Sequence, residues 1–343
     1  MAVRRGLSTR DREKPFLLLA AVAVGLLVNR LVGGAEALLP LVEVGVFLVI
    51  FAVMLPVEIT DVGRAFRKVK PTLLALAINF VFIPAFAWGL GWALLRGIPD
   101  VWAGVILYTL TPCIGWYLIF TDLAEGDVPW GMALLPWNIT LQVALLPVYL
   151  YLLVGQIVPL DVAALARSVV LFLILPFALG WVVQRTVIAR RGREFFFGPV
   201  KRATGEVKLW ALVIVIVAMF ASQRALDLGD LGQVGLIIAA LLAFFAVLFG
   251  VALAVGRIAR LSYAENVTLA FTTTARNSEA IIGVAVSAFP GHPLVYLAIV
   301  LGPVVELPVL LLLARLLVAL RNRMAAGATS VAAAHDLEML PRG

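Results

Sequence analysis

The chain has 343 residues, of which 63% are hydrophobic and only 14% are charged, and its mean hydropathy is +1.07. A water-soluble domain is close to half apolar and a quarter charged, so this composition excludes the soluble classes and indicates a polytopic membrane protein. The net charge of +7 comes from Lys and Arg grouped in a few segments between apolar runs. That pattern is typical of membrane topology and does not indicate a nucleic-acid partner.

Windows of about 20 apolar residues predict ten spans that cross the lipid bilayer. In chain order they cover residues 15–32, 38–58, 71–95, 101–121, 131–155, 162–184, 209–226, 233–256, 265–289 and 293–320. The first span follows Arg4 and Arg5, as a signal peptide would, but no convincing small-residue cleavage site comes after it. We therefore interpret it as a retained span.

Lys and Arg are divided unevenly between the connections, and this predicts the orientation. They are concentrated in residues 1–14, 64–70, 185–208, 257–260 and 321–323, whereas the alternate connections hold only Arg96. The positive-inside rule therefore predicts a multi-pass protein of the cytoplasmic membrane with both termini in the cytoplasm.

This orientation gives the expected organisation of the chain. A cytoplasmic N-terminal segment, 1–14, precedes spans one to six in 15–184. A basic cytoplasmic loop, 185–208, separates these from spans seven to ten in 209–320. Residues 321–343 are expected to be a disordered cytoplasmic tail, because the sequence from Met324 has no sustained apolar period.

Two of the apolar runs are interrupted by polar residues. Thr111-Pro112-Cys113 lies in the middle of 101–120, and the segment from Thr272 to Glu279 lies in the middle of 267–289. A broken helix frees backbone groups that lipid cannot satisfy, so such breaks persist only inside protein or beside a cavity. A charged residue at bilayer depth costs about 2.5–3.5 kcal/mol on insertion scales, so Arg276 with Glu279 indicates a functional site.

The breaks fall in the fourth and ninth spans, which occupy the same place in each set of five. The spans that follow also correspond, because each places Pro beside a polar side chain, at Pro136–Asn138 and at Pro303–Pro308 around Glu306. The sequence therefore predicts an all-α integral membrane fold of two inverted five-helix repeats, whose broken helices four and nine cross at one site. The alternative for each break is a simple kink at Pro or Thr.

No nucleotide-binding or catalytic zinc motif occurs, so we expect a protein that is not an enzyme and needs no cofactor. Energy for transport would come from an ion gradient or from the membrane potential.

At these residues the chain resembles the arsenical-resistance (Acr-type) arsenite efflux permeases of the bile acid/sodium symporter superfamily. The blocks that carry the resemblance are 110–115, 122–127, Asn138 with Gln142, 277–280 and 302–309. The resemblance implies a ten-span carrier that exports arsenite, and also antimonite, in exchange for protons. The functional cysteine and glutamate of the family fall on Cys113 and Glu279. The chain departs from the family at Pro112, where Arg is usual, and at Arg276, where Asn is usual.

Cys113 is the only cysteine of the chain. A lone membrane cysteine is usually a packing residue, but its place at a helix break beside Thr111 favours a role as a transient thiolate ligand of arsenic(III). Thr111, Asn138, Asn277 and Ser278 are neutral oxygen donors that suit a hydroxylated solute or a cation, and with Arg276 they complete the predicted substrate site. Their alternative role is helix-to-helix hydrogen bonding. Asn79, between Ile78 and Phe80 in an apolar run, is a weaker candidate for this site.

The predicted proton-coupling residues are Glu279 and Glu306. Glu279 follows Arg276 by three residues, which would place both on one helical face within ion-pair reach. A carboxylate beside a guanidinium in a buried site can be poised to gain and lose a proton. The alternative is a structural ion pair that holds the break.

Two other functions compete with metalloid export. The first is a sodium-coupled importer of an organic anion with the same fold. In sodium-coupled relatives an acidic residue and a Gln flank the crossing in the ninth span, and by spacing these positions are Thr272 and Arg276 in this chain. Arg276 would repel a sodium ion there but would attract an anion. The second is a membrane sensor or assembly factor, which lacks support because no soluble output domain is visible.

Overall fold

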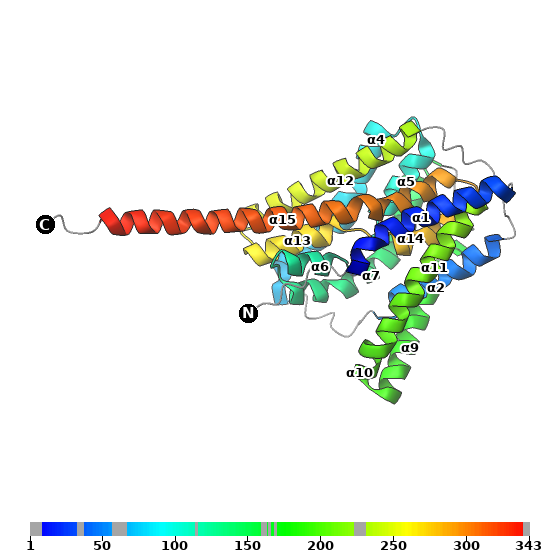
Figure 1. Ribbon diagram of the computed structural model, residues 1–343, viewed down its shortest axis with the longest axis horizontal. Helices are drawn as coiled ribbons and strands as arrows, with labels where there is room; N and C mark the ends of the chain where they lie inside the picture. The colour runs from blue at the N-terminus through cyan, green and yellow to red at the C-terminus, as the bar shows by residue number, and fades with distance from the viewer. Residues whose placement is uncertain are drawn as a thin grey trace.

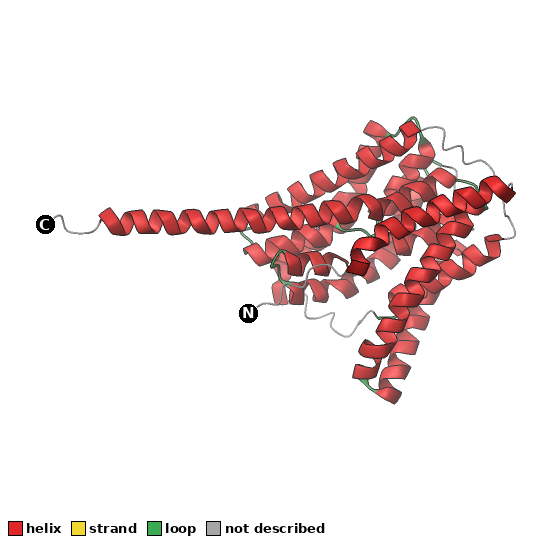
Figure 2. Cartoon of the chain, viewed as in Figure 1, coloured by secondary structure: helices red, strands yellow, loops and turns green. Residues whose placement is uncertain are grey.

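The computed structural model describes residues 9–32, 38–56, 67–113, 116–158, 163, 166–167, 170–222 and 231–338. These residues are almost entirely helical and include no β-strand (Figures 1 and 2). The predicted all-α class is therefore confirmed. The connections 57–66 and 223–230 and much of the start of predicted span six lie outside the described residues.

The α-helices are α1 (Thr9–Val32), α2 (Leu39–Met54), α3 (Val69–Ala77), α4 (Ile83–Leu94), α5 (Pro99–Thr109), α6 (Trp116–Leu123), α7 (Val128–Tyr149), α9 (Leu175–Arg191), α10 (Arg193–Phe195), α11 (Lys201–Ala221), α12 (Leu231–Ile258), α13 (Tyr263–Thr274), α14 (Ser278–Ala288) and α15 (Pro293–Glu338). The described residues also include the π-helical segments η3 (Ile78–Phe82), η4 (Leu150–Val154), η5 (Val170–Ile174) and η6 (Phe196–Val200).

Five helical stretches in the described part are long and apolar enough to cross a membrane. They are Val69–Leu94, Val128–Val154, Arg193–Ala221, Gly232–Ile258 and Pro293–Arg321. Each overlaps one of the predicted spans, and the predicted spans at 101–121 and 265–289 are divided into α5 with α6 and α13 with α14. The chain is thus a multi-pass membrane protein.

Two segments are more helical than the sequence suggested. The basic segment 185–208 is expected to be a loop, but α9 extends into it as far as Arg191, the chain turns at Gly192, and α10, η6 and α11 follow without another break. The φ of +84° at Gly192 is accessible to glycine without strain. The backbone of α15 continues to Glu338, across residues expected to be disordered. In both cases charge and missing apolar periodicity indicate exposure, but they do not prevent a helix in segments rich in Arg, Glu or Ala.

The contacts divide the helices into two groups. α11 packs along α1 and α2, and α9 packs on α2, so these four form one group, which we call the α11 group. In the other group α5 packs along α15 and α12 packs along α13. The two groups meet where α14 contacts α2 and where α1 contacts α15, while the hairpin of α9 and α11 projects from the bundle (Figure 1).

Aromatic side chains fill the core of the second group. Tyr108 of α5 lies edge-on to Phe245 of α12, with 6.4 Å between the ring centroids, and Phe249 of α12 lies 6.2 Å from Phe271 of α13. α12 therefore forms an apolar wall behind the ends of α5 and α13.

A proline shows how this bundle satisfies backbone groups within its spans. Pro84 lacks an N–H, so the carbonyl of Phe80 loses its usual helical donor. The hydroxyl of Tyr149 donates a hydrogen bond to that carbonyl at 2.5 Å. A neighbouring helix thus supplies the partner that lipid cannot.

The close contact of α5 with α15 generates a prediction. A Cβ atom at Gly104 would lie 2.7 Å from the carbonyl oxygen of Val295 and 2.8 Å from the Cβ of Ala298. We therefore expect Gly104→Ala to reduce the free energy of unfolding by about 1–3 kcal/mol, because the packed interface cannot accept another methyl group.

Gly250→Ala in α12 is the matched control, because no atom lies within 4 Å of its added Cβ. We expect it to be neutral or stabilising, since Ala is the better helix former. Thermal unfolding of the purified protein in detergent measures both variants. Equal midpoints would contradict the tight α5–α15 contact.

Candidate functional site

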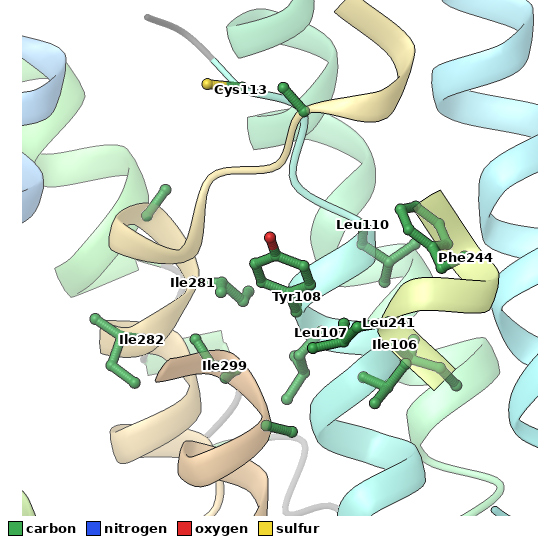
Figure 3. Close-up of a cluster of buried hydrophobic side chains, with 14 of the residues drawn as sticks. Ile106, Leu107, Tyr108, Leu110, Cys113, Leu241, Phe244, Ile281, Ile282 and Ile299 are labelled. Carbon is green, nitrogen blue, oxygen red and sulfur yellow. The ribbon is translucent and has the colours of Figure 1, made fainter. Parts of the chain in front are cut away.

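The two helix breaks lie directly against each other. Pro112, between α5 and α6, pairs in antiparallel fashion with Arg276, between α13 and α14. The N–H of Cys113 donates to the carbonyl of Ala275 at 3.0 Å, and the N–H of Asn277 donates to the carbonyl of Thr111 at 2.8 Å. We call this pairing the crossing, and Figure 3 shows its two segments side by side at Cys113. The prediction that the interruptions meet is confirmed.

The sequence explains why α5 ends here. Pro112 has no N–H, so it cannot donate to the carbonyl of Tyr108 four residues earlier. The hydroxyl of Thr111 lies 3.0 Å from that carbonyl and donates to it instead, and it also lies 3.0 Å from the carbonyl of Asn277 across the crossing. Thr111 therefore closes the end of α5 and fixes the second segment against it.

The end of α13 is satisfied completely, although it is buried. Its last turn leaves the carbonyls of Thr272, Thr273 and Thr274 without a donor within the helix, whereas Phe271 keeps its helical bond. Phe271 accepts from the N–H of Ala275 at 3.0 Å, and Thr272 accepts from Asn79 Nδ2 at 3.3 Å. The last two, Thr273 and Thr274, accept from the side chain of Arg276.

Arg276 is only 3% exposed, and neutral oxygens accept the hydrogen bonds of its guanidinium. Its Nη1 donates to the carbonyl of Thr109, at the end of α5, at 3.0 Å. Its Nη2 donates to Asn79 Oδ1 at 3.0 Å, and its Nε donates to Thr274 at 3.3 Å. The ring of Phe244 covers the guanidinium, with 5.9 Å from Cζ to the ring centroid. Arg276 therefore joins the ends of α5 and α13.

An amide chain extends this network to α7. Asn79 Nδ2 donates to Asn138 Oδ1 at 3.4 Å, and Asn138 Nδ2 donates to Thr272 Oγ1 at 3.3 Å. Asn79 lies in η3, where the wider π-helical turn shifts the face on which a side chain projects, a feature common at functional sites. Asn79 is only a weak candidate from the sequence, although it interrupts an apolar run just as Asn138 does.

Glu306 reaches the crossing from α15 and is 3% exposed. One carboxylate oxygen accepts from the backbone N–H of Arg276 at 3.0 Å, and the other accepts from the hydroxyl of Tyr108. That hydroxyl points toward the crossing in Figure 3. Tyr108 was not singled out in the sequence, because a Tyr in an apolar run reads as a core residue.

The remaining predicted site residues are placed differently. Cys113 is 2% exposed and lies in the crossing itself. Ser278 begins α14 and lines a small pocket at the contact between the two helix groups, with Leu212, Ile216, Ile282, Ile299, Val300 and Pro303. The side chain of Glu279 lies outside the described part of the chain. The expectation that Arg276 shares a helical face with Glu279 is wrong, because Arg276 lies in the extended break before α14.

Several polar atoms near the crossing are buried without a hydrogen-bond partner in the described structure. They include Asn277 Nδ2, Thr274 Oγ1, and both Nε2 and Oε1 of Gln142, which is 2% exposed and lies one turn after Asn138 on α7. Asn277 Oδ1 caps α14 by accepting from the N–H of Ala280 at 3.2 Å. Unpaired buried groups are costly, so this set indicates where a polar solute or water would be bound.

One ionic cluster positions the helices that carry the site. Lys68, before α3, lies 2.8 Å from Asp127 before α7 and 2.5 Å from Glu265 in the first turn of α13. Burial lowers the pKa of Lys68, but hydrogen bonds and charges from the two carboxylates outweigh this and raise its pKa overall. The helices bearing Asn79, Asn138 and Thr272 therefore begin from one cluster.

The Tyr108–Glu306 bond generates a second prediction. We expect Tyr108→Phe to cost about 1.5–3 kcal/mol, because it removes a hydrogen bond to a charged group. Tyr296→Phe is the matched control, since Tyr296 is also buried but donates to the neutral carbonyl of Phe289 and should cost only about 0.5–1.5 kcal/mol.

Thermal unfolding of both variants, with a double-mutant cycle on Glu306→Gln, measures the coupling. Equal costs for the two Tyr→Phe changes, with no coupling to Glu306, would contradict the assignment.

Comparison with known proteins supports a transport role for this arrangement. The model of the Sodium Bile acid symporter family matches residues 43–227, which is more than half of the chain. The arsenical-resistance protein Acr3 of Corynebacterium glutamicum is 27% identical over 324 residues, covering 89% of this chain and 87% of the relative. Acr3 of Alkaliphilus metalliredigens is 24% identical over 337 residues, covering 91% and 93%. YbaS of Bacillus subtilis, an uncharacterized protein, is 26% identical over 281 residues, covering 81% and 88%. The chain therefore belongs to the Sodium Bile acid symporter family and is a membrane transporter, not an enzyme.

Proposed function

We propose that this protein is a secondary active transporter that exports arsenite across the cytoplasmic membrane in exchange for protons. The observation that carries the proposal is the position of Cys113, the only thiol of the chain, at the crossing of two helix breaks. The two Acr3 relatives, which match nearly the whole chain, support the choice of an arsenical substrate.

The chemistry of the crossing suits a neutral hydroxylated metalloid. Arsenic(III) is soft and prefers thiolate ligands, and a single thiol can bind it without trapping it. Asn277, Thr274 and Gln142 carry buried polar atoms without partners in the described structure, and these could bond to the hydroxyl groups of the solute. The same reasoning extends to antimonite.

The arrangement of the helices supports alternating access by a ten-span inverted repeat. The α11 group takes the first two predicted spans of each half, and the second group takes the last three of each half. The pocket at Ser278 is walled by α11 on one side and by α14 and α15 on the other, so it lies where the two groups would separate. The basic turn between α9 and α11 supports a cytoplasmic position for that end, and with it for both termini.

Proton coupling is assigned to Glu279 and Glu306. Glu306 is buried at the crossing and bonds to the backbone of Arg276, so its charge would affect the segment that holds the substrate. Glu279 lies in the first turn of α14, beside Ser278 in the chain.

The alternative is a sodium-coupled symporter of an organic anion with the same fold, in keeping with the name of the family. That function would require Arg276 to present its guanidinium to the anion. Arg276 instead donates four hydrogen bonds to protein oxygens, which leaves it little capacity for a ligand. We therefore favour the exporter.

The third prediction tests the thiol. Cys113→Ser should reduce arsenite tolerance of a sensitive host to that of cells without the transporter, because a hydroxyl is a hard and poor ligand for arsenic. Ser222→Ala is the control, since Ser222 is buried in the α11 group and, within the described residues, its hydroxyl donates to the carbonyl of Ala218 one turn earlier. Membrane abundance is measured for both. Full tolerance with Cys113→Ser would rule out thiol ligation.

The fourth prediction separates the two carboxylates. Glu279→Gln should abolish arsenite accumulation in everted vesicles driven by a pH gradient, because Gln cannot titrate, while arsenite exchange without a gradient persists. The measurement is the pH profile of both fluxes for Glu279→Gln and Glu306→Gln. Undiminished proton-driven flux with Glu279→Gln would assign coupling to Glu306.

A further inference from the structure

The surroundings of the Arg276 guanidinium are unusual for a buried arginine. Its four acceptors are three backbone carbonyls, of Thr109, Thr273 and Thr274, and the amide oxygen of Asn79. All four oxygens are neutral. The guanidinium donates to no carboxylate in the described structure, so the dipoles of these oxygens stabilise its charge, together with the Glu306 carboxylate that accepts from the backbone N–H of Arg276 at 3.0 Å.

Features other than the Arg276 side chain already orient these oxygens toward a cation. Thr109 ends α5, and Thr273 and Thr274 end α13, so the three carbonyls lie at the negative ends of two helix dipoles. Asn79 is fixed in rotation, because its Nδ2 donates to Asn138 and to the carbonyl of Thr272, and its Oδ1 therefore faces the guanidinium. The ring of Phe244 presents its electron-rich face to the same charge.

We infer that these oxygens form a monovalent-cation site and that the guanidinium of Arg276 occupies it as a cation tethered to the chain. Carbonyl and amide oxygens are ligands for alkali metal ions. In carriers with broken helices, unwound carbonyls and the C-terminal ends of half-helices coordinate the coupling ion. A tethered charge cannot leave the site, so sodium cannot serve as a coupling ion at this position.

Two simpler roles for Arg276 make different predictions. As an anion-binding residue it would need donors directed away from the protein, but four of its five N–H groups already serve the protein. As a helix cap alone it would lose stability on truncation, but no particular ion would restore it. Selective rescue by a small cation therefore distinguishes the tethered-cation role.

The experiment measures thermal unfolding of purified Arg276→Ala in detergent at fixed pH and ionic strength. Choline chloride is replaced stepwise by lithium, sodium or potassium chloride, and guanidinium chloride is tested at low millimolar concentration. We expect the midpoint of Arg276→Ala to fall in choline and to recover saturably with sodium or guanidinium. The wild-type midpoint should be the same with every cation.

Two variants control for loss of structure. Arg276→Leu fills the space without a charge and should respond to no cation. Adding Asn79→Ala to Arg276→Ala removes the side-chain oxygen and should weaken the cation response. If Arg276→Ala does not fold, Arg276→Gln, which keeps a short polar side chain, is titrated instead. Absence of a saturable, cation-specific shift, or an equal shift in the wild type, overturns the inference.

The readout contains no arsenite, so this test is independent of the proposed function. Failure to export arsenite would leave the cation site standing, and failure of cation rescue would leave the exporter standing. A transport measurement adds one comparison. Arsenite flux of the wild type in vesicles should be equal with sodium or with potassium as the only salt cation.

Discussion

The structure depends on one constraint, which is that backbone groups freed inside a membrane must find partners in the protein. Two helices end within the bundle, and each unsatisfied group there would cost several kcal/mol. The chain meets this constraint by pairing the two broken ends with each other and by placing an arginine among the carbonyls that remain. The positions of α5, α6, α13 and α14 follow from that pairing.

The sequence predicted the parts of the site that depend on backbone chemistry. Pro112 and the run of polar residues from Thr272 interrupt apolar spans, and this alone locates the breaks and implies that they meet. The sequence could not rank Asn79 or Tyr108, because their importance comes from the partner each meets across the bundle. The prediction that Arg276 and Glu279 share a helical face is also wrong, since three-residue spacing places side chains together only within a continuous helix.

The two residues at which the chain departs from the arsenite permeases, Pro112 and Arg276, lie next to each other in the structure. Pro112 and Arg276 are bridge partners, so the arginine expected on one segment is supplied by the residue directly opposite. The guanidinium then donates to the carbonyl of Thr109 at the end of α5. A positive charge is thus kept at the crossing, beside Cys113 and Asn277 of the proposed substrate site.

This pairing also limits how the carrier can move. Opening the crossing would expose its two backbone hydrogen bonds and the four donated by Arg276, all at bilayer depth. The contact between the helix groups is different, because the pocket there is lined mainly by aliphatic side chains such as Ile216, Ile282 and Ile299. Sliding along such a surface breaks no directional bonds and exchanges one apolar contact for another. The proposed alternating access should therefore occur by movement of the α11 group against an intact crossing, and the proposed substrate would be exposed in turn to each side at the boundary that Ser278 lines.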